Sequence, residues 1–63
     1  MTTRAEQKKR SHAAIVTAAA RRVREQGIAG MGVAEVMSDA GLTHGGFYSH
    51  FKNKDALAAE AIS

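Results

Sequence analysis

The sequence has no cysteine, no proline and no tryptophan, and it contains no long apolar run. Without cysteine, the chain forms no disulfide bonds and offers no thiolate to a metal. A bilayer-spanning helix needs about 18 apolar residues in succession, and the basic N-terminus leads into no apolar signal-peptide core. Its 63 residues build only one small hydrophobic core, which excludes most enzymes. We therefore expect one small cytoplasmic domain that does not enter a membrane.

Positive charge is concentrated in the first part of the chain. The formal net charge is +3, but residues 1–24 hold seven Lys or Arg and one Glu, and the remaining residues hold two Lys and five acidic side chains. This separation favours a polyanion such as nucleic acid as the partner, although charge runs also occur as solvated helix surface. Charge alone therefore leaves nucleic-acid binding open.

Apolar residues recur with helical spacing, and strand patterns are scarce. In the first long segment, the stripe predicted to be buried consists of Ile15, Ala18, Ala19 and Val23. Thr3 and Glu6 have the spacing of a capping box, so we expect this helix to begin near Thr3 with frayed first turns, with Ser11 as a second possible start. Gly27 is expected to end it as a left-handed C-cap.

A second apolar repeat indicates a short helix that is followed by a tight turn. Its members are Val33, Val36, Met37 and Ala40. Gly41 is expected to end this helix, Leu42 to reach the core, and the Thr43 hydroxyl to cap a third helix over 44–51. Two short helices joined by a turn that contains glycine form a helix-turn-helix pattern. The predicted fold is therefore an all-α small helical bundle with a helix-turn-helix.

A fourth helix is expected after Asn53, which can cap it, and Asp55 suits its N-terminal end. The apolar residues of this segment are Leu57, Ala58, Ala61 and Ile62. Because the chain is short, we expect this apolar face to find little to pack against.

The third helix carries two glycines, although each costs about 1 kcal/mol relative to alanine in a helix interior. One interpretation is close approach, because a turn without Cβ atoms can press its backbone against a base edge or a phosphate. The alternative is that residues 44–46 are a loop and the helix begins at Phe47. In either case Gly45 and Gly46 are candidate binding residues.

All three aromatic residues of the chain lie in this same segment. Phe47 and Phe51 are four residues apart and are predicted to anchor the third helix in the core. Tyr48 faces elsewhere and, with His50 and Lys54, provides donors suited to phosphate oxygens. The alternative for Tyr48 is a half-buried position at the rim of the core.

The histidines do not suggest a metal or catalytic site. His44 and His50 are six residues apart, on different sides of a helix, and His12 is distant in sequence. No histidine pair has metal-binding spacing, and no nucleophile has a base placed by sequence to serve it. We expect no metal, no cofactor and no enzymatic activity, and interpret His44 and His50 as hydrogen-bond donors.

The segment VAEVMSDAGLTHGGFYSHFKNKDAL at 33–57 resembles the DNA-binding domain of the tetracycline-repressor (TetR) family of bacterial transcriptional regulators. AGLT at 40–43 is similar to the family's turn, FYSHF at 47–51 to its aromatic signature, and KDAL at 54–57 to the start of its fourth helix. Residues 15–27 are similar to the family's first helix.

The resemblance covers about residues 11–63. It implies a TetR-type helix-turn-helix domain there, with residues 1–10 as a basic N-terminal arm or the frayed first turns of the first helix. It also implies that a larger helical domain for inducer binding and dimerisation is absent from this chain.

The resemblance also implies roles for individual residues. The positions expected to contact phosphates are Thr43, Tyr48, His50 and Lys54. The positions expected to face base edges are His44, Gly45 and Gly46. Gly32 stands where relatives usually have a Thr or Ser that touches a phosphate; it still offers its backbone N–H.

The function implied is that of a repressor that binds a palindromic operator in double-stranded DNA as a homodimer and is released by a small-molecule inducer. Two alternatives stay open from the residues alone. One is another nucleic-acid-binding helical domain without an inducer. The other is a helical protein-interaction module that uses its alanine-rich faces.

Overall fold

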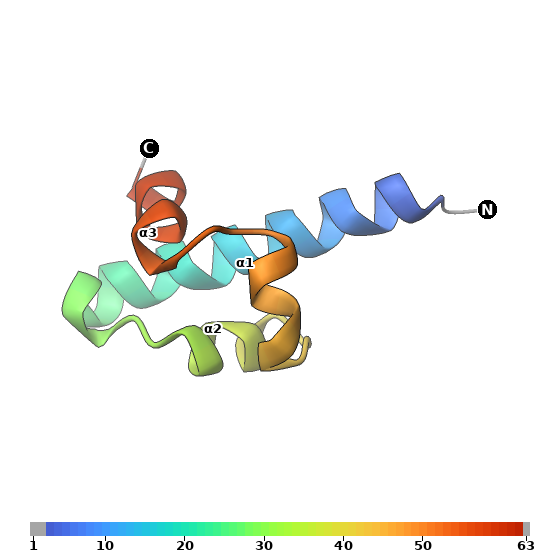
Figure 1. The fold of residues 1–63 in the computed structure, drawn as a ribbon. Coiled ribbons are helices and arrows are strands. Elements are labelled where there is room, and N and C mark those ends of the chain that lie inside the picture. Colours follow the sequence, from blue (N-terminus) through green and yellow to red (C-terminus); the bar gives the residue numbers. More distant parts are fainter. Residues whose placement is uncertain (1–2, 63) are drawn as a thin grey trace.

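The computed structural model describes residues 3–62, which form three α-helices and two 3-10 helices (Figure 1). In chain order they are α1 (Arg4–Gln26), η1 (Ile28–Gly30), α2 (Val33–Asp39), η2 (His44–Ser49) and α3 (Lys54–Ile62). No strand occurs within that range. The predicted all-α fold is confirmed. Residues 1 and 2 of the expected arm and residue 63 of the expected domain lie outside the described residues.

Helix α1 begins where the capping box predicts. The Thr3 hydroxyl oxygen accepts a hydrogen bond from the backbone N–H of Glu6 at 3.2 Å. The helix then runs without a break through the expected boundary at residue 10. Gly27 ends the helix as predicted, with a positive φ of 77°, but its ψ of 171° is extended, so only the expected left-handed helical conformation is wrong. No helix in the described part of the chain is long and apolar enough to cross a membrane.

One hydrophobic core joins all the α-helices. Its buried members are Ile15, Ala18, Ala19, Met31, Val36, Met37, Phe47, Phe51, Leu57 and Ala58. The predicted stripe of α1 is therefore confirmed, with Val23 packed at the edge of the core. In Figure 1, α1 is the long axis, with α2 and η2 below it and α3 above it. Because α1 contacts both α2 and α3, its apolar stripe holds the bundle together.

The turn of the helix-turn-helix is a Schellman motif. The N–H of Leu42 donates to the carbonyl of Met37 at 2.9 Å, and the N–H of Gly41 donates to the carbonyl of Ser38 at 3.0 Å. Gly41 has a φ of 75°, which a residue without a Cβ adopts at no steric cost. Leu42 packs against the core, as predicted. The turn thus fixes the direction in which η2 leaves α2.

The third helical segment begins at His44, as predicted, but it is a 3-10 helix and ends at Ser49. The alternative in which residues 44–46 form a loop is wrong. The expected hydroxyl cap is also wrong, because the Thr43 side chain makes no capping bond; its carbonyl accepts from the N–H of Gly46 at 3.1 Å. Two adjacent glycines disfavour the α-helix, which is consistent with a 3-10 segment here, although its six residues exceed the usual three or four.

Helix α3 begins with the predicted cap, since the Asn53 side-chain oxygen accepts from the N–H of Ala56 at 2.9 Å. Leu57 and Ala58 are buried against the core. The expectation that this apolar face has little to pack against is therefore wrong, because α3 packs against α1. Only the end of the helix stays open, with Ile62 60% exposed.

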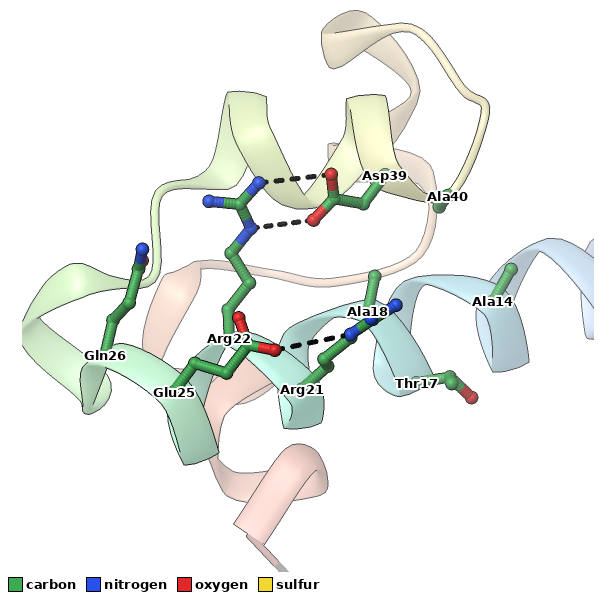
Figure 2. Close-up of a pocket in the computed structure, with 9 residues that line it drawn as sticks. All are labelled: Ala14, Thr17, Ala18, Arg21, Arg22, Glu25, Gln26, Asp39 and Ala40. Carbon is green, nitrogen blue, oxygen red and sulfur yellow. Dashed lines mark hydrogen bonds and ion pairs between the residues drawn. The ribbon is translucent and has the colours of Figure 1, made fainter.

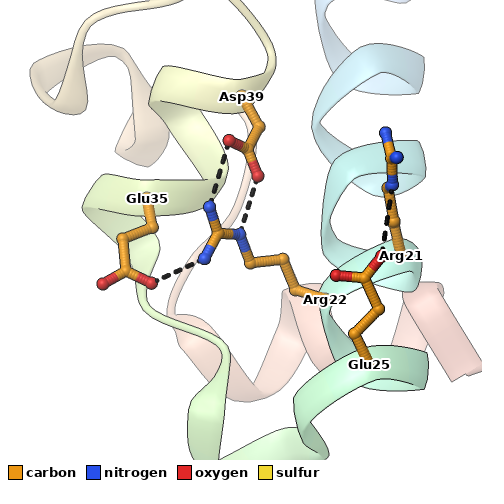
Figure 3. A network of polar contacts seen from close by, with 5 residues as sticks. All are labelled: Arg21, Arg22, Glu25, Glu35 and Asp39. Carbon is orange, nitrogen blue, oxygen red and sulfur yellow. Dashed lines mark hydrogen bonds and ion pairs between the residues drawn. The ribbon is translucent and has the colours of Figure 1, made fainter.

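Two arginine side chains on α1, next to α2, form ion pairs (Figure 3). Arg22 crosses to α2 and pairs with both Glu35 and Asp39, whereas Arg21 pairs with Glu25 on the same helix. Arg22 is therefore committed to holding α2 on α1. Part of the positive charge of residues 1–24 is structural for this reason.

Candidate nucleic-acid interface

The exposed residues at the turn and in η2 lie close together in the sequence. Thr43, His44, Gly45 and Tyr48 are all exposed, while Phe47 is only 1% exposed and faces the core. The Phe47 ring packs with the Phe51 ring at a centroid distance of 5.7 Å, so the predicted anchor is confirmed. This anchor holds η2 with its other side toward solvent.

Tyr48 is 70% exposed, so the half-buried alternative for this residue is wrong. Its ring meets the edge of the Phe47 ring at a centroid distance of 5.0 Å and an interplanar angle of 82°. Residues three apart are eclipsed in a 3-10 helix, which places Tyr48 in line with Gly45. The Tyr48 phenol and the backbone of Gly45 therefore lie on the same exposed side of η2.

Nothing in the fold requires glycine at the start of η2. Neither Gly45 nor Gly46 has a positive φ. A Cβ at Gly45 would meet no heavy atom within 4 Å. At Gly46 it would meet Met37 Cε at 3.8 Å and Thr43 Oγ1 at 3.9 Å, which is ordinary contact. The fold would therefore accept alanine at both positions, and glycine there only leaves the backbone without a side chain.

His50 lies just after η2 and turns toward α1. It is half-buried, and its Nδ1 is buried without a hydrogen-bond partner among the described residues. Burial lowers the pKa of His50 below 6.5, and the nearby charges of His12 and Lys8 lower it further. The ring is therefore mainly neutral at pH 7. A neutral imidazole still donates one N–H, so a phosphate contact would rest on a hydrogen bond.

His12 forms a tie between α1 and α3 that sequence reasoning missed. Its Nε2 lies 3.1 Å from Oε1 of Glu60, and its ring stacks on Phe51 at a centroid distance of 4.5 Å. Glu60 follows His12 by 48 residues, so no local spacing indicates this contact. This contact lies next to His50, whose ring centroid is 5.9 Å from that of His12.

The other two predicted site residues lie on elements outside η2. Gly32 is the N-cap of α2, and its carbonyl accepts from the N–H of Val36 at 2.9 Å. A Cβ at Gly32 would lie 3.5 Å from Oε2 of Glu35, so a carboxylate stands beside this position. Arg22 pairs with that carboxylate. Lys54 is the first residue of α3 and is half-buried.

A surface groove of about 710 Å³ lies between α1 and the end of α2 (Figure 2). Its lining residues are Ala14, Thr17, Ala18, Arg21, Arg22, Glu25, Gln26, Asp39 and Ala40. None of the predicted DNA-facing residues lines it, and its charged side chains pair with one another or with α2. Within residues 3–62, no three His, Cys, Asp or Glu side chains are grouped to hold a metal ion.

Comparison with known proteins agrees with this geometry. A family model described as bacterial regulatory proteins, tetR family, matches residues 15–61, which is most of the chain. That range contains all of α2, the Schellman turn and η2. No curated protein and no solved structure gives a significant match. The resemblance seen in the sequence is thus confirmed, and the chain belongs to the tetR family of bacterial regulatory proteins.

Proposed function

We propose that this chain is the operator-reading part of a transcriptional repressor. Its family consists of DNA-binding transcriptional regulators, and its regulatory domain is not an enzyme fold. In the proposal, the protein binds a palindromic operator as a homodimer in the bacterial cytoplasm. A small-molecule inducer, bound in a larger helical domain that follows the DNA-binding part in such regulators, releases it.

The observation that carries the proposal is the bare, exposed backbone at the start of η2. Gly45 and Gly46 have room for a side chain and no need of a positive φ, so alanine would serve the fold better. Binding gives these glycines a purpose, because their backbone can approach a base edge more closely than a residue with a Cβ. His44 stands beside them as the exposed donor that reads a base.

The phosphate contacts are proposed on both sides of this backbone. Thr43 and Tyr48 present exposed hydroxyls, which are common donors to phosphate oxygens. His50 and Lys54 extend the row of donors from the end of η2 to the start of α3. Gly32 contributes only a backbone N–H. Such contacts set the position of the protein on the duplex, while the base contacts set sequence preference.

The dimer places two copies of η2 in successive major grooves. Dimeric helix-turn-helix proteins bind half-sites about 34 to 36 Å apart, one turn of the duplex. The two-fold symmetry of the dimer then requires a near-palindromic operator.

The decisive experiment selects duplexes from a random-sequence DNA pool with the chain and measures the affinity of the selected site against salt concentration. Each phosphate that a lysine or arginine neutralises contributes about −0.9 to the slope of log affinity against log salt, so affinity should fall as the salt concentration rises. A parallel titration uses duplex DNA whose selected bases are scrambled. The expected result is a steep slope for both and higher affinity for the selected site.

Two outcomes contradict the proposal. Preference for structured RNA over duplex DNA would indicate another nucleic-acid-binding module. A protein partner that stays bound at roughly 0.5 M salt, where phosphate contacts are heavily screened, together with salt-independent DNA affinity, would indicate a protein-interaction module.

A further inference from the structure

The first turns of α1 extend past the rest of the fold. In Figure 1 the blue end of α1 projects beyond η2, with no other element beside it. Residues 4–10 are all exposed. At a rise of about 1.5 Å per residue, the 23 residues of α1 cover about 35 Å. The long dimension of the molecule is 37 Å, so α1 alone sets it.

Two basic residues of this projecting segment lie on the face of α1 that meets the rest of the bundle. Lys8 precedes the buried Ile15 by seven residues, which is about two turns and keeps the same face. Arg4 precedes Arg22 by eighteen residues, about five turns, and Arg22 is the residue that reaches α2. The inner face of α1 therefore changes from apolar to basic where it leaves the bundle.

The two neighbouring cations point elsewhere. Lys9 and Arg10 follow Lys8 by one and two residues, and each step turns about 100° around the helix axis. Arg10 lies near the side of the acidic residue Glu6, away from the inner face. The projecting segment thus has two cations, Arg4 and Lys8, on its inner face. Two others, Lys9 and Arg10, point away from that face.

The inner cations are not used by the ion pairs of the described residues. Within residues 3–62, Arg4 and Lys8 form no ion pair, whereas Arg21 and Arg22 both do. The charge of Lys8 lowers the pKa of His50, so Lys8 lies within electrostatic range of the residue that follows η2. The only carboxylate that the described residues bring to this end of η2 is Glu60, and it pairs with His12.

We propose that Arg4 and Lys8 bind phosphates of duplex DNA that lie beyond those reached from η2. The inference rests on the proposed operator binding and extends it to a second backbone contact. The seven projecting residues cover about 10 Å. One DNA strand carries a phosphate for each 3.4 Å of helix axis or so, so this segment passes about three of them.

The test compares two double variants of equal net charge. R4Q/K8Q removes the inner cations, and K9Q/R10Q removes the outer ones; both leave the Thr3–Glu6 cap in place. Each variant is titrated with a 30-base-pair duplex carrying the site selected by the unmodified chain, over a range of salt concentrations. R4Q/K8Q should reduce the steepness of the log–log salt slope by about 2, since each phosphate contact contributes about 0.9. K9Q/R10Q should change the slope by less than half of that amount. Circular dichroism checks that both variants keep their helix content.

Backbone cleavage protection of the same duplex gives a second readout. R4Q/K8Q should lose protection at the outer phosphates and keep it opposite η2, while K9Q/R10Q keeps both. Equal slopes and equal protection for the two variants would overturn the inference and leave operator binding intact. If the unmodified chain selects no duplex at all, the proposed function fails and this contact fails with it.

Discussion

Arg22 on α1 binds both carboxylate oxygens of Asp39 at the end of α2 (Figure 3). Its Nε donates to Oδ2 at 2.7 Å, and its Nη2 donates to Oδ1 at 3.1 Å. The remaining Nη1 donates to Oε2 of Glu35 at 2.9 Å, near the start of the same helix. A single guanidinium thus holds α2 at both ends, a geometry that the planar fork of arginine allows and a lysine does not.

This contact predicts an acid-sensitive fold. The hydrogen bond from Arg22 lowers the pKa of Asp39 below its ordinary value of 3.8. The ionised Asp39 therefore stabilises the fold above pH 3.8, and this stabilisation is lost as the pH falls through the lowered pKa. Asp39→Asn should lower the free energy of unfolding at pH 7 and flatten its decline below pH 4. Urea denaturation at several pH values measures both.

The matched control for Asp39→Asn is Glu25→Gln. Glu25 pairs with Arg21 on the exposed surface of one helix, and such pairs contribute little to stability. If both variants lower the free energy of unfolding by the same amount, the ion pairs between α1 and α2 contribute no more than a surface pair within one helix.

Alanine at Gly45 should have opposite effects on folding and on DNA binding. Because Gly45 has no positive φ and open space at its Cβ, Gly45→Ala should stabilise the chain by about 0.5 to 1 kcal/mol. The same Cβ should weaken duplex binding about tenfold, the cost of one lost base contact. Gly41→Ala provides the contrast, since its φ of 75° predicts a destabilisation of about 1 to 2 kcal/mol. Unchanged DNA affinity in the stabilised Gly45→Ala variant would refute close approach.

His50 should make folding and DNA binding respond to pH with opposite signs. Its pKa in the fold lies below 6.5 because of burial and of the charges on His12 and Lys8, so protonation favours the unfolded chain and stability falls as the pH drops below 6.5. Protonation also adds a charge toward phosphate, so affinity should rise over the same range. His50→Gln should reduce both trends, whereas His44→Gln, at an exposed position, should retain the stability trend. A stability profile that His50→Gln leaves unaltered would contradict this assignment.

Tyr48 and His44 should differ in how they affect sequence preference. Tyr48→Phe removes a hydroxyl from a proposed phosphate contact and should weaken binding to all duplexes alike, by about fivefold. His44→Ala should change the preferred base at one position, where a good base contact is worth about 1 to 3 kcal/mol. Competition between the selected duplex and its single-base variants measures both effects. Thr17→Val, in the groove between α1 and α2, is the control that should change neither. Uniform weakening by His44→Ala would reassign that residue to the backbone.

Much of the fold follows from local patterns. The spacing of Ile15, Ala18 and Ala19 predicts the inner face of α1, because the helical period alone brings these residues together. Thr3, Gly41 and Asn53 mark helix ends at the predicted places, since caps depend on residues three or four positions apart. The candidate interface is predictable to the same extent, because Thr43 to Tyr48 are consecutive.

The sequence by itself therefore determined the three α-helices, most of their ends and the family. Only the tertiary structure decided which charges are committed to the fold and which remain available. Arg22 joins Glu35 and Asp39, and His12 joins Glu60, through contacts between residues that are far apart in the chain. No periodicity encodes such pairs, because they depend on how α1, α2 and α3 pack against one another. The same packing turns His50 toward α1, leaves Tyr48 in solvent and carries the first turns of α1 beyond the bundle.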